Sequence, residues 1–112
     1  MEESLGKYLV ILRKEKLNIE VSRQMAKKLE ITPQYMHDIE NDNRIPSKRV
    51  LNKIEKVFNL NQREKEKLYD LASNSYKEKK VPEDIAAFII ENDDAKIKIR
   101  RMMKEYKNKE GV

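Results

Sequence analysis

Residues 21–44 constrain the fold of this chain most, because they predict two short helices separated by a tight turn. Apolar residues recur at helical spacing in the first helix and form one stripe, which consists of Met25, Ala26 and Leu29. Thr32 suits the N-cap of the second helix, because its hydroxyl can accept a hydrogen bond from a free backbone N–H. Pro33 suits the first helical position, where its missing N–H removes no hydrogen bond.

The second predicted helix has a narrow apolar side and a broad polar side. Met36 and Ile39 are expected to point inward. The outer side is then left with hydrogen-bonding groups, which belong to Gln34, His37, Asp38 and Asn41. A helix with two apolar anchors and such a polar face is suited to presenting that face to a partner.

This stretch resembles the helix-turn-helix of the phage repressor and Cro-like (XRE) family, a group of small bacterial transcription regulators. The matching positions are Met25, Ala26, Leu29, Ile31, Thr32, Tyr35, Ile39, Glu40, Asn41, Arg44 and Pro46. The resemblance covers roughly residues 4–72 and implies a bundle of about five helices. Two positions depart from the family pattern. Glu30 and Asp42 stand where the family favours Gly and where the backbone tends toward positive φ, at a cost on the order of 1 kcal/mol for Glu.

A first helix is predicted over residues 4–16, before the helix-turn-helix. Its apolar stripe consists of Leu5, Leu9 and Leu12, widened by Tyr8 and Ile11. Ile19 and Val21 are expected to fill the gap before the next helix, and Ser22 is expected to be the N-cap of that helix.

The chain is predicted to be all-α, with a five-helix repressor-like bundle followed by two C-terminal helices. Ser47 is expected to cap the fourth helix, and Asn61 with Glu64 forms a capping-box pattern that starts the fifth. These helices define a predicted DNA-binding domain over residues 1–76 and a helical extension over residues 77–112.

The composition supports a small helical protein that is attracted to polyanions. The chain has 112 residues, of which 38% are hydrophobic and 40% charged, so a thin core lies under a highly charged surface. With 2 Gly and 3 Pro, a β-sandwich or barrel with many turns is disfavoured. The net charge of +5 favours polyanion binding. The lack of Cys excludes disulfides and thiolate metal sites and fits the cytoplasm, and no apolar run approaches the roughly 20 residues that span a bilayer.

Catalysis has no supporting residues in this sequence. His37 is the single histidine, which excludes Ser-His and multi-His sites, and no Gly-rich phosphate loop is present. The acidic pairs Glu83-Asp84 and Asp93-Asp94 fit ordinary helix starts, where they are favoured by the helix dipole. We therefore expect no enzyme, no cofactor and no metal.

The polar face of the second helix predicts contacts with DNA bases. The amide of Gln34 could pair bidentately with adenine, Asp38 could accept from a cytosine amino group, and His37 could donate to a purine N7. The methyl and methylene groups of Thr32 and Pro33 could touch a thymine methyl. The predicted base contacts are Pro33, Gln34, Tyr35, His37 and Asp38. His37 and Asp38 could equally be solvated helix residues, and the resemblance places Tyr35 at a phosphate or groove wall.

Phosphate contacts are expected near helix N-termini and in the loop that follows the second helix. Free N–H groups and the helix dipole at an N-terminus suit an anion. The predicted phosphate contacts are Ser22, Arg23, Thr32, Asn43, Arg44, Ser47 and Lys48. Glu40, beside the inward Ile39, is expected to be partly buried and stabilised by an ion pair or by bonds to the loop backbone.

The two C-terminal helices, separated at Asn92-Asp93, carry a wide apolar surface that consists of Ile85, Phe88, Ile89 and Ile90. This surface either covers the flank of the bundle or packs against a second chain. The resemblance implies dimers on pseudo-palindromic operators, so a homodimer is predicted. The predicted function is sequence-specific regulation of transcription, as a repressor that binds double-stranded DNA. The alternative is an antitoxin-like module that binds a protein partner and its own promoter.

Overall fold

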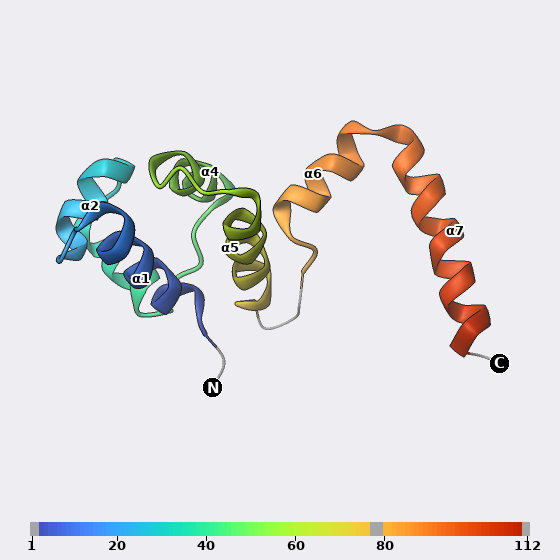
Figure 1. The fold of residues 1–112 in the computed structure, drawn as a ribbon, viewed down its shortest axis with the longest axis horizontal. Coiled ribbons are helices and arrows are strands. Elements are labelled where there is room, and N and C mark those ends of the chain that lie inside the picture. The colour runs from blue at the N-terminus through green and yellow to red at the C-terminus, as the bar shows by residue number, and fades with distance from the viewer. Residues whose placement is uncertain (1–2, 77–79, 111–112) are drawn as a thin grey trace. The chain divides into compact units, whose positions relative to one another are not determined.

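The computed structural model describes residues 3–76 and 80–110, and within these residues every regular element is a helix. The helices of this described part are α1 (Leu5–Leu17), α2 (Ser22–Leu29), α3 (Pro33–Glu40), α4 (Lys48–Val57), α5 (Gln62–Asn74), α6 (Glu83–Glu91) and α7 (Asp93–Glu110) (Figure 1). The prediction of an all-α chain with a helix-turn-helix bundle and two further helices is confirmed.

The chain divides into two compact units, Met1–Pro82 and Glu83–Val112. The first unit contains α1 to α5, and the second contains α6 and α7. The predicted domain boundary between residues 76 and 77 borders residues 77–79, which lie outside the described residues.

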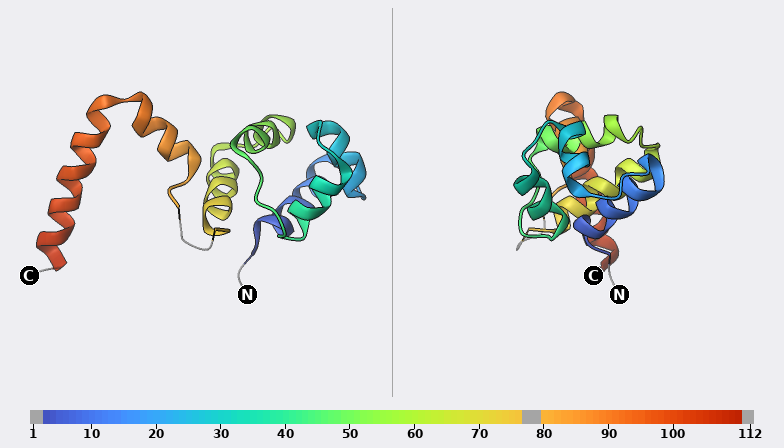
Figure 2. Two further views of the ribbon diagram at one scale, coloured as in Figure 1. Left: turned by 180° about the vertical axis from the view of Figure 1, so that it is seen from behind. Right: turned by 90° about the vertical axis from the view of Figure 1, so that its left-hand side faces the viewer.

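The first unit is a bundle in which α3 packs against both α1 and α2 (Figures 1 and 2). Helix α4 packs against α2 and α5, and α1 packs against α5. The large apolar side chains that are fully buried include Leu9, Met25, Leu29, Met36, Ile39, Ile54 and Leu68. Each such side chain contributes about 1.5–3 kcal/mol when it leaves water. Because α1 to α5 all contribute to this core, it fixes α3 against the other helices.

The helix starts follow the predicted capping residues with one exception. The hydroxyl of Ser47 accepts from the backbone N–H of Val50, and Asn61 and Glu64 form the reciprocal capping box. The prediction that Ser22 caps α2 is wrong. Ser22 is the first residue of α2, and Val21 occupies the N-cap position without a side-chain cap bond.

Two residues that were expected to point inward are exposed. Ile11 is 42% exposed because it lies two residues, about 200° around the helix, from the buried Leu9. Val21 is 52% exposed in an extended conformation at the start of α2, whereas Ile19 is buried as predicted. The core face of α1 is therefore narrower than its sequence suggests.

The second unit carries apolar side chains at its surface. Ile85, Phe88 and Ile90 of α6 are exposed, and Ile89 is half-buried. Within the described chain, no helix combines the length and the apolar character needed to cross a membrane.

Candidate nucleic-acid interface

The turn between α2 and α3 contains the left-handed residue that the sequence predicted. Glu30 has a φ of 57°, and the backbone N–H of Ile31 donates to the carbonyl of Ala26 over 3.0 Å. Asp42, the second such position, has a φ of 60°. Lys53 of α4 adds a bond that was not predicted, because its Nζ donates to the carbonyl of Leu29 over 3.2 Å. This bond holds the end of α2 against α4.

Helix α3 starts as predicted and is anchored by two side chains. The Thr32 hydroxyl accepts from the backbone N–H of Tyr35 over 3.1 Å, and Pro33 occupies the first turn. Met36 and Ile39 are each 1% exposed. The opposite side of α3 therefore faces outward in a fixed orientation.

The outward side of α3 carries the polar groups that were expected there. Pro33, Gln34 and His37 are exposed, while Tyr35 and Asp38 are half-buried. The Nε2 of Gln34 donates to Oδ1 of Asp38 over 2.9 Å. An amide has two N–H protons and one carbonyl, and bidentate pairing with adenine needs only one proton and the carbonyl. The bond to Asp38 can therefore orient Gln34 without blocking that pairing.

Tyr35 connects α3 to the following loop and to α4. Its hydroxyl accepts from the backbone N–H of Ser47 over 3.2 Å. The Arg44 guanidinium lies over its ring, 5.0 Å from the centroid, in a cation–π arrangement. The predicted contact of Tyr35 with a base stays a prediction, and these bonds place it at the edge of the outward face.

Side-chain and backbone hydrogen bonds close the end of α3. Asn41 Nδ2 donates to the carbonyl of His37 over 2.8 Å, and the backbone N–H of Asn43 donates to the carbonyl of Asp38 over 2.8 Å. These bonds set the start of the loop that leads to Arg44. They also limit the freedom of Asn43, which was predicted to contact a phosphate.

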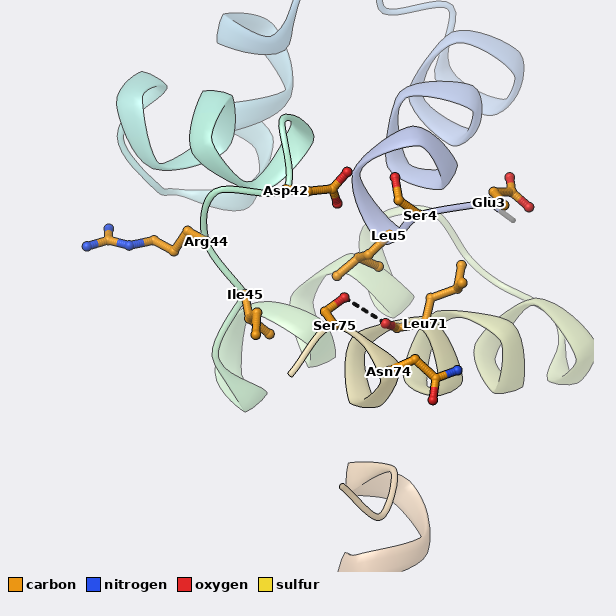
Figure 3. A pocket seen from close by; sticks show the side chains of 9 residues that line it. All are labelled: Glu3, Ser4, Leu5, Asp42, Arg44, Ile45, Leu71, Asn74 and Ser75. Atoms are coloured by element: carbon orange, nitrogen blue, oxygen red, sulfur yellow. Dashed lines mark hydrogen bonds between the residues drawn. The ribbon is translucent and has the colours of Figure 1, made fainter. Parts of the chain in front are cut away.

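The predicted phosphate contacts lie at the starts of α2, α3 and α4 and in the loop after α3. Arg23, Thr32, Asn43, Arg44, Ser47 and Lys48 are exposed, and Ser22 is half-buried. The hydroxyls of Thr32 and Ser47 accept cap bonds, which leaves their protons able to donate to a phosphate oxygen. Arg44 is one of the residues that line a surface pocket, and its side chain extends away from the other lining side chains (Figure 3).

Glu40 forms the ion pair that was one of its two predicted arrangements. Its carboxylate accepts from Nε and Nη2 of Arg13 over 2.7 and 3.1 Å, and each side chain is 8% exposed. Arg13 Nη1 also donates to the carbonyl of Ile19 over 2.9 Å. Arg13 was missed by sequence reasoning. Its burial could have been predicted from its position four residues after Leu9, on the core face of α1.

The start of α1 approaches the end of α3 closely at Gly6. The backbone N–H of Gly6 donates to Oδ1 of Asp42 over 2.9 Å, and in Figure 3 Asp42 points toward the start of α1. A Cβ added at Gly6 would lie 2.3 Å from the carbonyl oxygen of Glu40. This approach requires glycine, and the sequence alone did not reveal it.

Comparison with known proteins agrees with this geometry. Residues 11–61 match the profile of a family described as helix-turn-helix, and this range includes α2, α3 and α4 together with most of α1. No curated protein and no solved structure matches the chain. Residues 11–61 therefore form a helix-turn-helix domain of the phage repressor and Cro-like (XRE) family, a family of DNA-binding transcription regulators.

Proposed function

We propose that this protein is a transcriptional repressor that binds a palindromic operator as a homodimer. The observation that carries the proposal is the fixed outward face of α3. Met36 and Ile39 are buried at 1% exposure each, so the opposite side of the helix is held in place. A rigid helix with polar groups near its N-terminus suits the major groove of B-DNA, where each base pair has its own pattern of donors and acceptors.

Gln34 is proposed as the main base-reading residue. Its amide is exposed, lies in the first turn of α3 and is oriented by the 2.9 Å bond to Asp38. The remaining proposed base contacts are Pro33, Tyr35, His37 and Asp38. Of these, Pro33 and His37 are exposed, whereas Tyr35 and Asp38 are half-buried. This difference in exposure supports direct reading of bases by Gln34 and His37 and a supporting role for Asp38.

Phosphate contacts are proposed around this face. Arg23, Arg44 and Lys48 are exposed cations near the starts of α2 and α4 and in the loop after α3. Ser22, Thr32, Asn43 and Ser47 would add hydrogen bonds from hydroxyl, amide and backbone groups. Such contacts position the protein on the duplex and do not read sequence. The cation–π contact with Tyr35 restricts the Arg44 side chain, which supports its proposed role as a phosphate contact.

A repressor that uses one short recognition helix needs a second half-site for specificity. Two copies related by a twofold axis present two α3 helices to major grooves about one helical turn apart. Such a dimer on a promoter blocks access by other DNA-binding proteins. The proposal therefore predicts a palindromic site whose half-sites lie about 34–36 Å apart.

Selection of bound duplexes from a random library tests the proposal directly. We expect a palindromic consensus to emerge. Gln34→Ala should then weaken binding to the consensus by about 1–3 kcal/mol, or about 5- to 150-fold, with little loss on random DNA. Lys48→Ala is the matched control and should weaken binding to both duplexes equally. Equal losses for Gln34→Ala on both duplexes would contradict base reading by Gln34.

The regulatory direction has its own test. With the selected duplex placed over a promoter, the full chain should lower transcription of a reporter, and Gln34→Ala should restore it. Increased transcription by the wild-type chain would contradict repression while leaving DNA binding intact.

A further inference from the structure

The second unit carries an apolar stripe on both of its helices. From residue 85 to 106 the positions alternate by three and four residues, and they are Ile85, Phe88, Asn92, Ala95, Ile99, Met102 and Tyr106. Asn92 lies at the break between α6 and α7, so the series belongs to two helices. On each helix, residues at this three- and four-residue spacing share one face, which suits packing against another helix.

Much of the stripe is open to solvent in the described chain. Phe88 is 60% exposed, Met102 is 50% exposed and Tyr106 is 61% exposed. Ile85 is also exposed, Ile99 is half-buried, and Ala95 is buried. Large apolar side chains that are exposed in a contiguous series mark an interaction surface more often than isolated ones do.

The charges of this unit are segregated along the chain. Residues 83–94 contain five acidic and no basic residues, which are Glu83, Asp84, Glu91, Asp93 and Asp94. Residues 95–108 contain six basic residues and one acidic residue, which are Lys96, Lys98, Arg100, Arg101, Lys104, Lys107 and Glu105. The net charges are therefore −5 in the first segment and 6 − 1 = +5 in the second.

This segregation selects both the partner and its direction. Two antiparallel copies place the acidic segment of each chain beside the basic segment of the other, which is attractive at both ends. Two parallel copies place like charges together at both ends, which is repulsive. Antiparallel pairing also opposes the helix dipoles favourably. The same surface then serves on both chains, as a twofold interface requires.

We infer that a second copy of this chain covers the stripe, with the two α6–α7 units paired in antiparallel orientation. The inference rests on the homodimer in the proposed function and adds its interface and its direction. It also changes the predicted surface. Ile85 and Phe88 belong to the stripe and Ile89 lies beside it, whereas Ile90 lies on the opposite side of α6. Helix α7 supplies the rest of the stripe.

The oligomeric state of the full-length chain and its variants tests the interface. Wild-type protein should have the mass of two chains by light scattering at tens of micromolar. Tyr106→Glu alters an exposed side chain of the stripe and should give the mass of one chain. Ile99→Glu should act in the same direction. Ile97→Glu is the matched control, because Ile97 is 61% exposed on the opposite side of α7 and should leave the dimer intact.

Cross-linking tests the direction, and the absence of native Cys makes single-cysteine variants specific. Ile85→Cys and Tyr106→Cys lie at opposite ends of the stripe. In antiparallel pairs, a short thiol cross-linker should join the two variants when they are mixed, and should join neither variant efficiently to itself. Efficient self-cross-linking of Ile85→Cys, without gain in the mixture, would overturn the antiparallel arrangement.

A monomeric wild-type chain would overturn the inference, because the stripe would then be covered within its own chain or by a different protein. A dimer that survives Tyr106→Glu and Ile99→Glu would overturn it too, because the interface would lie elsewhere. A monomeric wild-type chain would also contradict the homodimer in the proposed function, whereas a dimer with a different interface would leave that function intact. The selection experiment measures base reading by α3 separately. A failure of the interface can therefore be distinguished from a failure of the proposed function.

Discussion

Arg13 and Glu40 illustrate how single residues position the DNA-binding surface. Glu40 is the last residue of α3, and its bidentate bond to Arg13 ties that end to α1. A second link is the hydrogen bond from the backbone N–H of Gly6 to the Asp42 carboxylate, which joins the start of α1 to the loop after α3. None of these residues lies on the outward face. They set the angle at which that face is presented.

The Arg13–Glu40 pair gives a prediction at this scale. Arg13→Met leaves the Glu40 carboxylate buried without its cation, so the free energy of unfolding should fall by about 3–5 kcal/mol. The double variant Arg13→Met/Glu40→Leu removes both charges and should recover much of that loss. Urea unfolding followed by circular dichroism measures both values. A loss below about 1 kcal/mol in the single variant would mean that the pair behaves like a surface salt bridge.

Residues whose partners lie nearby in sequence could be predicted, and residues with distant partners could not. Thr32 and Ser47 cap helices through bonds that span three residues, so a local pattern contained the information. The bond between Asp42 and Gly6 spans 36 residues, and no local pattern reports it. Glu40 was intermediate, since its burial was predictable from Ile39 but its partner Arg13 was not.

At the scale of elements, the turn between α2 and α3 combines a predictable geometry with an unfavourable residue. The left-handed position at Glu30 followed from the resemblance to the helix-turn-helix, and its φ of 57° confirms it. The Ser22 cap failed because α2 begins at that residue instead of after it. This one failure moves the start of a helix by a single residue, which is the usual spread of helix boundaries.

Glu30→Gly should stabilise the bundle. A residue with a side chain destabilises the folded state by about 1–2 kcal/mol in the left-handed region, and glycine does not. The greater backbone entropy that glycine loses on folding offsets about 0.5–1 kcal/mol of this gain. We expect a net gain of up to about 1 kcal/mol in thermal or urea unfolding. Lys28→Gly, in the same helix at an exposed position, is the control and should lose about 1 kcal/mol. Destabilisation by both variants would mean that Glu30 makes a compensating contact.

The start of α5 gives a pH-dependent prediction. The bond from Lys16, and then the bond from the backbone N–H of Asn61, hold the pKa of the Glu64 carboxyl below its ordinary value of 4.5. A lowered folded-state pKa adds stability that is present above pH 4.5 and is lost as the pH falls through the folded-state value. Glu64→Gln keeps a capping side chain but removes the titration. It should therefore lower stability at neutral pH and flatten the acid side of the stability profile.

Unfolding measured from pH 7 to pH 2 checks this prediction. Lys16→Met is the companion variant, because it removes the largest cause of the lowered pKa while retaining Glu64. Its profile should lie between those of the wild type and Glu64→Gln. An acid limb that is unchanged in both variants would show that other carboxylates control acid unfolding.

At the scale of the whole molecule, the proposed interface and the proposed DNA contacts together predict how tightly the protein binds a complete operator and an isolated half-site. Two α3 helices joined through paired α6–α7 units bind two half-sites with an effective concentration that a single unit lacks, which raises overall affinity by about 10²–10⁴-fold. Tyr106→Glu should therefore lose about that factor on the complete selected operator and bind an isolated half-site as the wild type does. Gel-shift titrations on the two duplexes at one salt concentration measure both affinities. Equal losses on both duplexes would mean that Tyr106 supports the DNA-binding bundle itself, and no loss on the complete operator would mean that the two half-sites are bridged elsewhere in the chain.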